Sequence, residues 1–146
     1  MVNYDSLKLD NQLCFPLYAC SKEIVRLYKP FLDEIDLTYT QYIVMMVMWE
    51  TGEINVKSLG ERLYLDSGTL TPLLKKLETK GYITRHRSAE DERNVIIRLT
   101  EDGEALKKKA VCIPEKMQGC VHLTRDEAFE LYRLLHKVLS TIGEGE

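Results

Sequence analysis

Several features that would assign a protein to a common class are absent from this 146-residue sequence. No apolar run approaches the ~20 residues that a membrane-spanning helix needs. The N-terminus lacks the basic segment followed by an apolar one that marks a secretion signal. The densest apolar run, 42–49, predicts a buried helix or strand. A cytoplasmic location, without a membrane partner, is the default expectation.

Metal-binding motifs are also missing. The sequence has four cysteines and three histidines, no two cysteines are spaced Cys-x-x-Cys, and the histidines are scattered. We therefore expect no metal site and no cofactor. In a reducing compartment the cysteines remain free thiols until an oxidant reaches them. They are Cys14, Cys20, Cys112 and Cys120.

Charge of one sign is not in large excess, and the net charge of −3 argues weakly against binding to nucleic acid. The distribution of charge argues the other way, because residues 57–98 hold nine Lys and Arg against six Asp and Glu. A locally basic face on an acidic body suits a protein that binds phosphate in one place. An ordinary mixed surface is the alternative.

The most informative pattern lies between Val56 and Leu99. Two helix-like segments are followed by two strand-like segments, at 56–63, 67–80, 82–87 and 95–99. Gly81 ends the second helix, and the polar tip 88–94 joins the strands. This order predicts a winged helix-turn-helix, mainly α with a small β-wing, which offers one helix to the major groove of DNA.

The second helix of this unit is expected to read the DNA. Its leucines form one face that is predicted to be buried. The polar side chains left outside are Ser67, Thr69, Thr71, Lys75 and Lys76. Short hydroxyls at the N-terminal end with lysines a turn later fit contacts to phosphates and base edges. A solvated amphipathic helix is the alternative.

The wing carries its own candidate contacts. Arg85 and Arg87 lead into the tip, and Arg93 lies on it. An arginine at a hairpin tip can enter a narrow minor groove, where the negative potential is enhanced. Asp91, two residues earlier, is placed to hold that guanidinium. The alternative is a solvated turn with an ion pair of little energetic value.

The flanking segments are longer than a DNA-reading unit needs. From 7 to 35 the pattern is helical, with a heptad-like apolar seam of Leu13, Leu17, Cys20, Ile24, Leu27 and Phe31. Capping boxes at Thr38 and Thr124, and a capping Thr100, open further helices. We expect a single domain over 1–146, with a DNA-binding lobe at 37–99. N- and C-terminal dimerisation helices, at 7–36 and 100–143, would form a homodimer that spaces two recognition helices ~34 Å apart.

Order and residues together resemble the MarR family of bacterial regulators across nearly the whole chain. The family's most specific signature is similar to Asp91-Glu-Arg93 followed by Val95-Ile-Ile-Arg-Leu-Thr-Glu-Asp-Gly103. The segments Leu9-Asp-Asn-Gln-Leu-Cys14-Phe, Tyr28-Lys-Pro and Leu37-Thr-Tyr39-Thr-Gln-Tyr resemble the OhrR branch, which senses organic hydroperoxides. The resemblance implies a dimeric repressor that leaves its operator when Cys14 is oxidised. It also implies Tyr28 and Tyr39 as hydroxyl partners of the thiolate.

The chemistry of Cys14 can be examined without the family. The start of a helix favours a thiolate, and tyrosine hydroxyls that donate to the thiolate stabilise it further. Cys14 and Tyr28 are fourteen residues apart, or ~21 Å along a continuous helix. Their contact therefore requires a partner subunit whose first helix crosses antiparallel. The alternative is that Cys14 is a small buried apolar residue.

Oxidation of Cys14 first gives a sulfenic acid, which condenses with a thiol in reach. The resemblance makes Cys120 the candidate resolving cysteine, since two-cysteine members of the branch carry one there. Cys112 is the second candidate, a small cellular thiol is a third, and a bystander role for both cysteines stays open. Cys20 lies on the seam and is expected to be structural.

The sequence thus predicts a transcriptional repressor that binds a pseudo-palindromic double-stranded operator and is induced by an organic hydroperoxide. Two other functions stay open. One is a MarR-type repressor released by a small aromatic ligand. The other, less favoured, is a thiol peroxidase, although nothing near Cys14 beyond Arg26 and Lys22 supports that enzyme.

Overall fold

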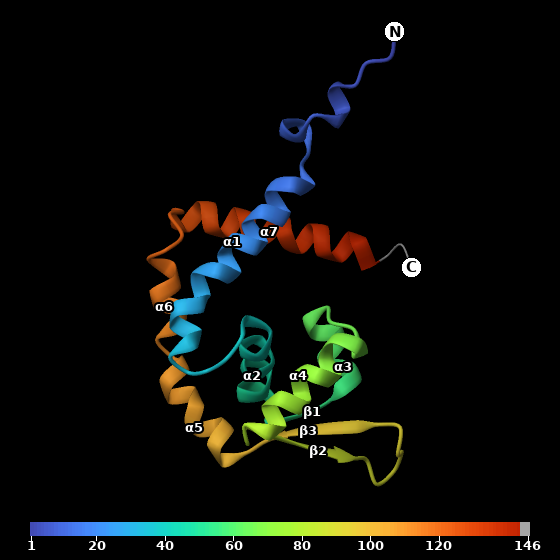
Figure 1. Cartoon of the computed structure of the whole chain (residues 1–146), viewed down its shortest axis with the longest axis vertical. Helices are drawn as coiled ribbons and strands as arrows, with labels where there is room; N and C mark the ends of the chain where they lie inside the picture. Colours follow the sequence, from blue (N-terminus) through green and yellow to red (C-terminus); the bar gives the residue numbers. More distant parts are fainter. Residues whose placement is uncertain (144–146) are drawn as a thin grey trace. The chain divides into compact units, whose positions relative to one another are not determined.

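A computed structural model describes residues 1–143 of the chain (Figure 1). Its helices are α1 Cys14–Asp33, α2 Tyr39–Thr51, α3 Val56–Leu63, α4 Ser67–Thr79, α5 Glu101–Ala110, α6 Ile113–Gln118 and α7 Arg125–Ile142. Its strands are β1 Glu53–Asn55, β2 Ile83–Arg87 and β3 Val95–Leu99. The chain divides into two compact units, Met1–Ile113 and Pro114–Glu146. No helix among the described residues combines the length and the apolar character needed to cross a bilayer.

Helix α2 is the centre of the first unit. It contacts α1, α3, α4, α5, β1 and β3, and its apolar side chains leave almost no polar face. Val44, Met45 and Met48 are fully buried. Burying each such side chain contributes roughly 1.5–3 kcal/mol. The same core takes in Leu59 of α3 and Leu74 of α4, so the two helices of the predicted helix-turn-helix are packed around one central helix.

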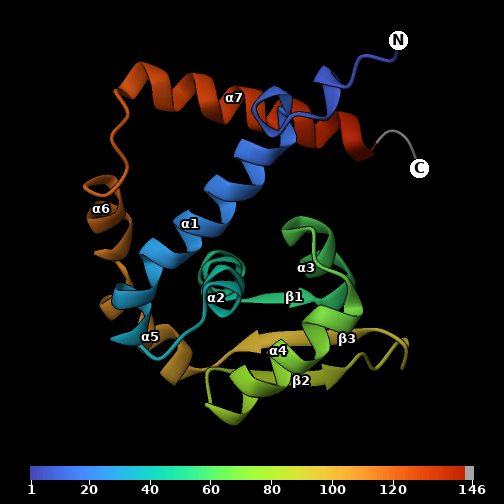
Figure 2. The same cartoon turned by 45° about the horizontal axis from the view of Figure 1, so that its top comes forward.

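A three-stranded antiparallel sheet follows, in the order β1-β3-β2. Ile54 pairs with Ile97 on one side of β3, and Arg85 pairs with Ile97 on the other. Figure 2 shows the β2–β3 hairpin extending beyond β1 at its tip, with α4 beside the sheet. Helix, turn, helix and winged hairpin therefore occur in the predicted order, and the short strand β1 pairs with β3 of the wing.

Helix ends follow the predicted capping residues. Thr38 and Gln41 form a capping box at α2, and Thr124 and Glu127 form one at α7. The Thr100 side chain accepts from the Gly103 N–H at the start of α5. Gly81 adopts a φ of +83° just after α4. Because that conformation is strained for residues with a Cβ, Gly81 allows the chain to turn sharply into β2.

The first helix begins later than predicted. Residues 5–7 and 9–11 form two 3-10 turns, and α1 starts only at Cys14. The Asn11 side chain donates to the Asp5 carbonyl (2.7 Å), and the Gln12 side chain donates to the Ser6 (2.7 Å) and Lys8 (2.8 Å) carbonyls. Side-chain amides that take up carbonyls in this way compete with the helical ladder. The apolar spacing did not reveal this competition.

The predicted seam on α1 is not buried within the single chain. Leu13, Leu17, Ile24 and Leu27 are all exposed, and so is Cys20, which was expected to be structural.

On α2, the Trp49 indole N–H donates to the Gly103 carbonyl (2.8 Å), and the indole meets the Tyr42 ring nearly edge-on. This contact joins the central helix to the start of α5.

Candidate nucleic-acid interface and thiol site

Helix α4 presents its polar residues to solvent as the sequence predicted. Leu70, Leu73, Leu74 and Leu77 are buried. The exposed side chains include Ser67, Thr69, Thr71, Lys75 and Lys76. Three short hydroxyls and two lysines therefore share the outer surface of a helix whose inner face is fixed in the core.

The N-terminus of α4 is already occupied by a carboxylate. Asp66 accepts a hydrogen bond from the Thr69 backbone N–H (2.7 Å), and this bond holds the pKa of Asp66 below its usual range. The Thr71 hydroxyl donates to the Ser67 carbonyl (2.8 Å), so the hydroxyl oxygen of Thr71 can still accept a hydrogen bond. Since Asp66 carries a negative charge there, an anion approaching this surface would be attracted to Lys75 and Lys76 rather than to the helix terminus.

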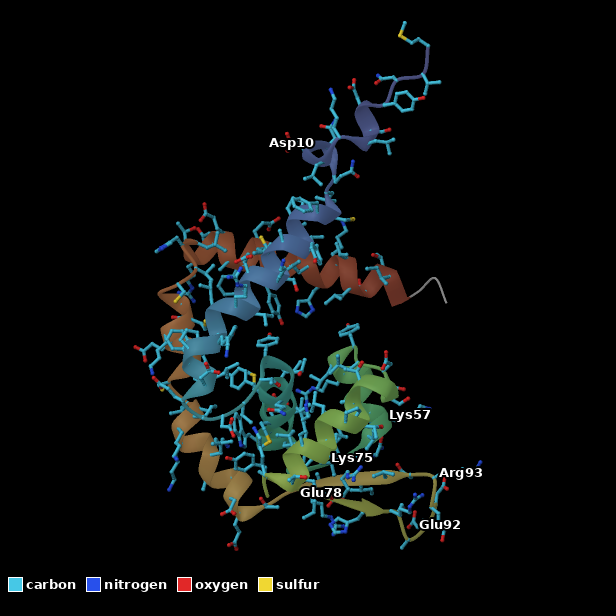
Figure 3. All side chains as sticks on the ribbon, in the orientation of Figure 1. Asp10, Lys57, Lys75, Glu78, Glu92 and Arg93 are labelled. Carbon is cyan, nitrogen blue, oxygen red and sulfur yellow. The ribbon has the colours of Figure 1, made fainter. Side chains whose placement is uncertain are left out.

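The tip of the wing exposes one arginine almost completely. The Arg93 side chain is 95% exposed, and its Nε lies 3.7 Å from Oδ1 of Asp91. Asp91 also accepts the Arg93 backbone N–H (3.0 Å). Figure 3 shows Arg93 at the end of the hairpin, extending away from the lobe. Arg87 donates to the Glu92 carbonyl (2.9 Å), which ties the strand to the tip.

Arg85 is placed differently from the other arginines of the wing. Its guanidinium and its backbone N–H are both bonded to the carboxylate of Glu78 on α4. Glu78 was not singled out from the sequence. The spacing Glu78 to Arg85 crosses a helix end and a turn, so no helical or strand periodicity could have paired them.

Lys57 is a further cation that the sequence left without a role. It lies on α3 beside the wing tip, and a surface hollow of about 450 Å³ is lined by Lys57, Ser58, Arg93 and Asn94, among others. The only sequence signal was its contribution to the basic segment.

The thiol of Cys14 stands at the first residue of α1 and is exposed. The preceding Leu13 offers no side-chain hydrogen bond to the helix terminus. The first backbone N–H groups of α1 therefore have no capping side chain, and the positive end of the helix dipole is open to an anion at this position.

The two predicted tyrosines come together at the opposite end of α1. The ring centroids of Tyr28 and Tyr39 are 5.0 Å apart, and Tyr42 completes the cluster at 5.8 Å from Tyr28. Burial raises the pKa of Tyr28 and of Tyr39, and it is the main cause that raises the pKa of Tyr42 to about 12. These hydroxyls therefore remain protonated donors at neutral pH. Tyr42 was missed, although its spacing of three from Tyr39 on one helix face is a signal.

Cys14 does not meet this cluster within the chain. Helix α1 is continuous from Cys14 to Asp33, so its first residue lies ~21 Å from Tyr28 along the axis. The Cys112 thiol lies close enough to Tyr42 for its charge to contribute to the raised pKa of that tyrosine. Cys120 is partly buried in the second unit, 3.5 Å from the Lys116 carbonyl. Over residues 1–143, no cluster of His, Cys, Asp and Glu is arranged to hold a metal ion.

Known proteins resemble this chain over most of its length. A family model described as "Transcriptional regulator SarA/Rot" matches residues 26–110. The organic hydroperoxide resistance transcriptional regulator of Bacillus subtilis (strain 168) is 50% identical over 141 residues, which are 97% of this chain and 96% of that protein. The HTH-type transcriptional regulator SarZ of Staphylococcus aureus (strain USA300) is 48% identical over 132 residues, covering 90% and 89%.

Solved structures of one regulator, AbfR of Staphylococcus epidermidis, superpose on the chain. Reduced AbfR bound to DNA matches with a TM-score of 0.81 and 31% identity over 98% of both chains. Overoxidised AbfR bound to DNA matches with a TM-score of 0.76 and 34% identity, over 94% of this chain and 97% of AbfR. AbfR with a disulfide formed matches with a TM-score of 0.63 and 34% identity, over 96% of this chain and 95% of AbfR.

Proposed function

This chain belongs to the SarA/Rot family of transcriptional regulators, within the OhrR-type branch of MarR regulators, and from this premise we propose that it is a repressor whose operator is released when Cys14 is oxidised by an organic hydroperoxide. Its relatives are transcriptional regulators, so the chain is a regulator and not a thiol peroxidase. A cytoplasmic location goes with the proposal, because the operator DNA of a bacterium lies there.

One observation carries the redox part of the proposal. Helix α1 holds an exposed thiol at its uncapped start, and the protonated hydroxyls of Tyr28 and Tyr39 lie near its other end. Two copies of α1 that cross antiparallel bring Cys14 of one subunit to Tyr28 and Tyr39 of the partner subunit. The hydroxyls would then donate to the thiolate, which stabilises the reactive form. The exposed apolar side chains of α1 and α7 supply the surfaces for such a homodimer.

The chemistry begins with attack of the Cys14 thiolate on the outer oxygen of the hydroperoxide. An S–O bond forms, the O–O bond breaks, and the leaving alkoxide takes a proton to become an alcohol. The resulting sulfenic acid condenses with a second thiol, which forms a disulfide and releases water. Cys120 is our candidate for that thiol, Cys112 the second, and a small cellular thiol the third.

The step that releases DNA is the disulfide rather than oxidation as such. AbfR has been solved on DNA in an overoxidised form and separately with a disulfide formed. A sulfinic or sulfonic group adds charge at one residue, whereas a disulfide displaces the segment that carries the second thiol. By analogy, we place operator release of this chain at disulfide formation.

The DNA part of the proposal uses α4 and the wing. Ser67, Thr69, Thr71, Lys75 and Lys76 would contact the major groove of a pseudo-palindromic operator. Arg93 would enter the minor groove, oriented by Asp91, with Arg87 beside the tip. Phosphate contacts supply most of the affinity.

Substitution of Cys14 by Ser tests the proposal. The probe is a duplex selected by the protein from a random-sequence pool, and its affinity is measured by fluorescence anisotropy before and after an alkyl hydroperoxide. The wild type should lose about tenfold or more in affinity, whereas Cys14→Ser should keep its affinity. Mass spectrometry of the treated wild type then identifies the thiol joined to Cys14.

Cys20→Ser is the matched control, because Cys20 is also an exposed thiol on α1 and should leave the response intact. Release of Cys14→Ser by peroxide would overturn the redox proposal. Release of both variants by a small aromatic acid without any thiol change would establish the ligand-gated alternative instead.

A further inference from the structure

Glu78 and Arg85 join the recognition helix to the first strand of the wing. Nε and Nη2 of Arg85 lie 3.3 and 3.1 Å from Oε1 of Glu78, and the Arg85 backbone N–H donates to Oε2 (3.2 Å). Both carboxylate oxygens are therefore used, and the planar guanidinium presents two donors to one of them. Charge-assisted contacts of this forked type are stronger and more directional than a single surface ion pair.

The low exposure of Arg85 and the charged state of Glu78 distinguish Arg85 from a residue that contacts DNA. The Arg85 side chain is 28% exposed, against 95% for Arg93 at the tip. The hydrogen bonds from the Arg85 side chain are the main reason that the pKa of Glu78 is lowered. The carboxylate therefore stays charged, and moving Arg85 onto a phosphate would leave Glu78 without its cationic partner.

The position of the pair shows what it can do. Glu78 follows Lys75 by one helical turn, and Arg85 precedes Arg87 by two residues on the strand that leads to the tip. The chain between α4 and β2 turns sharply at Gly81, which has a positive φ. At the turn itself, the Tyr82 backbone N–H donates to the Leu77 carbonyl (3.1 Å). The Glu78–Arg85 contact adds a side-chain attachment further along β2, and this attachment limits how far the strand can swing relative to α4.

We propose that Glu78 and Arg85 form a clip that fixes the angle between α4 and the wing, so that the major and minor grooves are entered together. Arg85 is then a positioning residue and not a contact to phosphate. This inference rests on the proposed DNA-binding surface, but it does not depend on oxidation of Cys14.

The clip and a direct contact predict opposite results for Glu78→Gln. If Arg85 contacted phosphate and Glu78 merely competed for it, the substitution would free Arg85 and tighten DNA binding. If the pair is a clip, Glu78→Gln should weaken specific binding by about tenfold, the order expected when one partly exposed hydrogen bond to a charged group is lost. Affinity is measured by anisotropy on the selected duplex over a series of salt concentrations.

The salt series separates the two roles of Arg85. A lost phosphate contact lowers the slope of log K against log salt by about 0.9. Arg85→Gln should weaken binding of the otherwise wild-type protein. In the Arg93→Ala background, which removes the charge that a swinging wing would withdraw from the DNA, Arg85→Gln should leave the slope unchanged, whereas Lys76→Ala should lower it. A lower slope for Arg85→Gln in that background, or tighter binding by Glu78→Gln, would overturn the clip.

A double-mutant cycle distinguishes positioning from simple loss of stability. Arg93→Ala should cost less affinity in the Glu78→Gln background than in the wild type, because a wing that swings no longer delivers Arg93 to the groove. An equal cost in both backgrounds would refute the inference. The charge-swapped pair Glu78→Arg with Arg85→Glu should recover part of the lost affinity, and thermal unfolding confirms that each variant is folded.

The cycle also shows which proposal fails. If Arg93→Ala and Lys76→Ala leave binding unchanged in the wild type, the DNA-binding surface is wrong and the clip has no DNA role. If those two variants weaken binding while Glu78→Gln and Arg85→Gln do not, the surface stands and the clip alone is overturned.

Discussion

Gly103, in the first turn of α5, lies directly against the backbone that enters β2. Its carbonyl accepts the Trp49 indole N–H, and its backbone N–H donates to Thr100. A Cβ at this position would lie 2.7 Å from Cδ1 of Leu99 and still closer to the Tyr82 carbonyl oxygen. The backbone of the β2 entry and the first turn of α5 therefore leave no space for a side chain.

Gly103→Ala should accordingly destabilise the protein by about 3 kcal/mol, the upper part of the range for overpacking. Urea unfolding followed by circular dichroism measures the change. Gly119→Ala is the matched control, because its nearest neighbour would be 3.5 Å away, and it should change stability by less than about 0.5 kcal/mol. Equal stability of both variants would show that α5 can move away from Tyr82.

At this scale the sequence predicted what local chemistry determines. Thr38, Thr100 and Thr124 were predicted as helix caps because a threonine hydroxyl at the start of a helix accepts the backbone N–H three residues later. Gly81 was predicted to end a helix because it directly follows a helical segment. The engagement of Arg85 by Glu78 was not predictable. It depends on how α4 packs on β2, which no local pattern encodes.

Tyrosine rings contribute to the contact between α1 and α2. Tyr28 of α1 lies against Tyr39 and Tyr42 of α2, and Tyr42 is only 3% exposed. Burial favours the neutral phenol, since a phenolate in this position would be poorly solvated. The cluster therefore makes the joint between these helices sensitive to alkaline pH.

The sign follows from the pKa of Tyr42, which burial, and then its tyrosine neighbours, raise from 10.0 to about 12. Its contribution to stability is present below pH 10 and is lost as the pH rises through about 12, because the unfolded chain releases the proton first. The urea midpoint of the wild type should fall as the pH rises from about 9 to about 12, and the midpoint of Tyr42→Phe should fall less steeply. A parallel decline of both proteins would remove the assignment to Tyr42.

Elements were predicted well where their ends carry signals and poorly where they do not. Val56–Leu63 and Val95–Leu99 agree with α3 and β3 to the residue, and Ser67–Thr79 ends one residue before the prediction. The first helix was predicted from Leu7 but begins at Cys14, since apolar spacing continued through residues whose carbonyls are bonded to Asn11 and Gln12. Periodicity reports which face is apolar, but it does not report where the backbone stops being helical.

Each of the two units exposes an apolar helix face when the chain is considered alone. On α1 the exposed residues include Leu13, Leu17, Ile24 and Leu27, and on α7 they include Leu131, Leu134, Leu135 and Val138. Helix α7 has no buried residue at all. Surfaces of this kind are costly in water and mark sites of association. Sequence spacing identified the seam on α1, and the excess length of the flanking helices led to the prediction that a second chain, rather than the chain's own core, covers them.

Leu131→Glu with Leu135→Glu should convert a dimer into a monomer, because each introduced carboxylate would be buried without a partner at the interface. Sedimentation velocity measures the change, and affinity for the selected duplex should fall because the two half-sites are no longer bound together. Ser140→Glu, which adds one carboxylate to an exposed position on α7 outside the leucine seam, should remain dimeric. A dimeric double variant would remove α7 from the interface.

The single tryptophan of the chain has a consequence of its own. The indole N–H of Trp49 donates to the carbonyl of Gly103 in the first turn of α5, and the Tyr42 ring meets the indole nearly edge-on. Emission from that one fluorophore therefore reports on the joint between the central helix and the element that follows the hairpin. A change in the packing of α5 against α2 can therefore be followed by intrinsic fluorescence, without an added label.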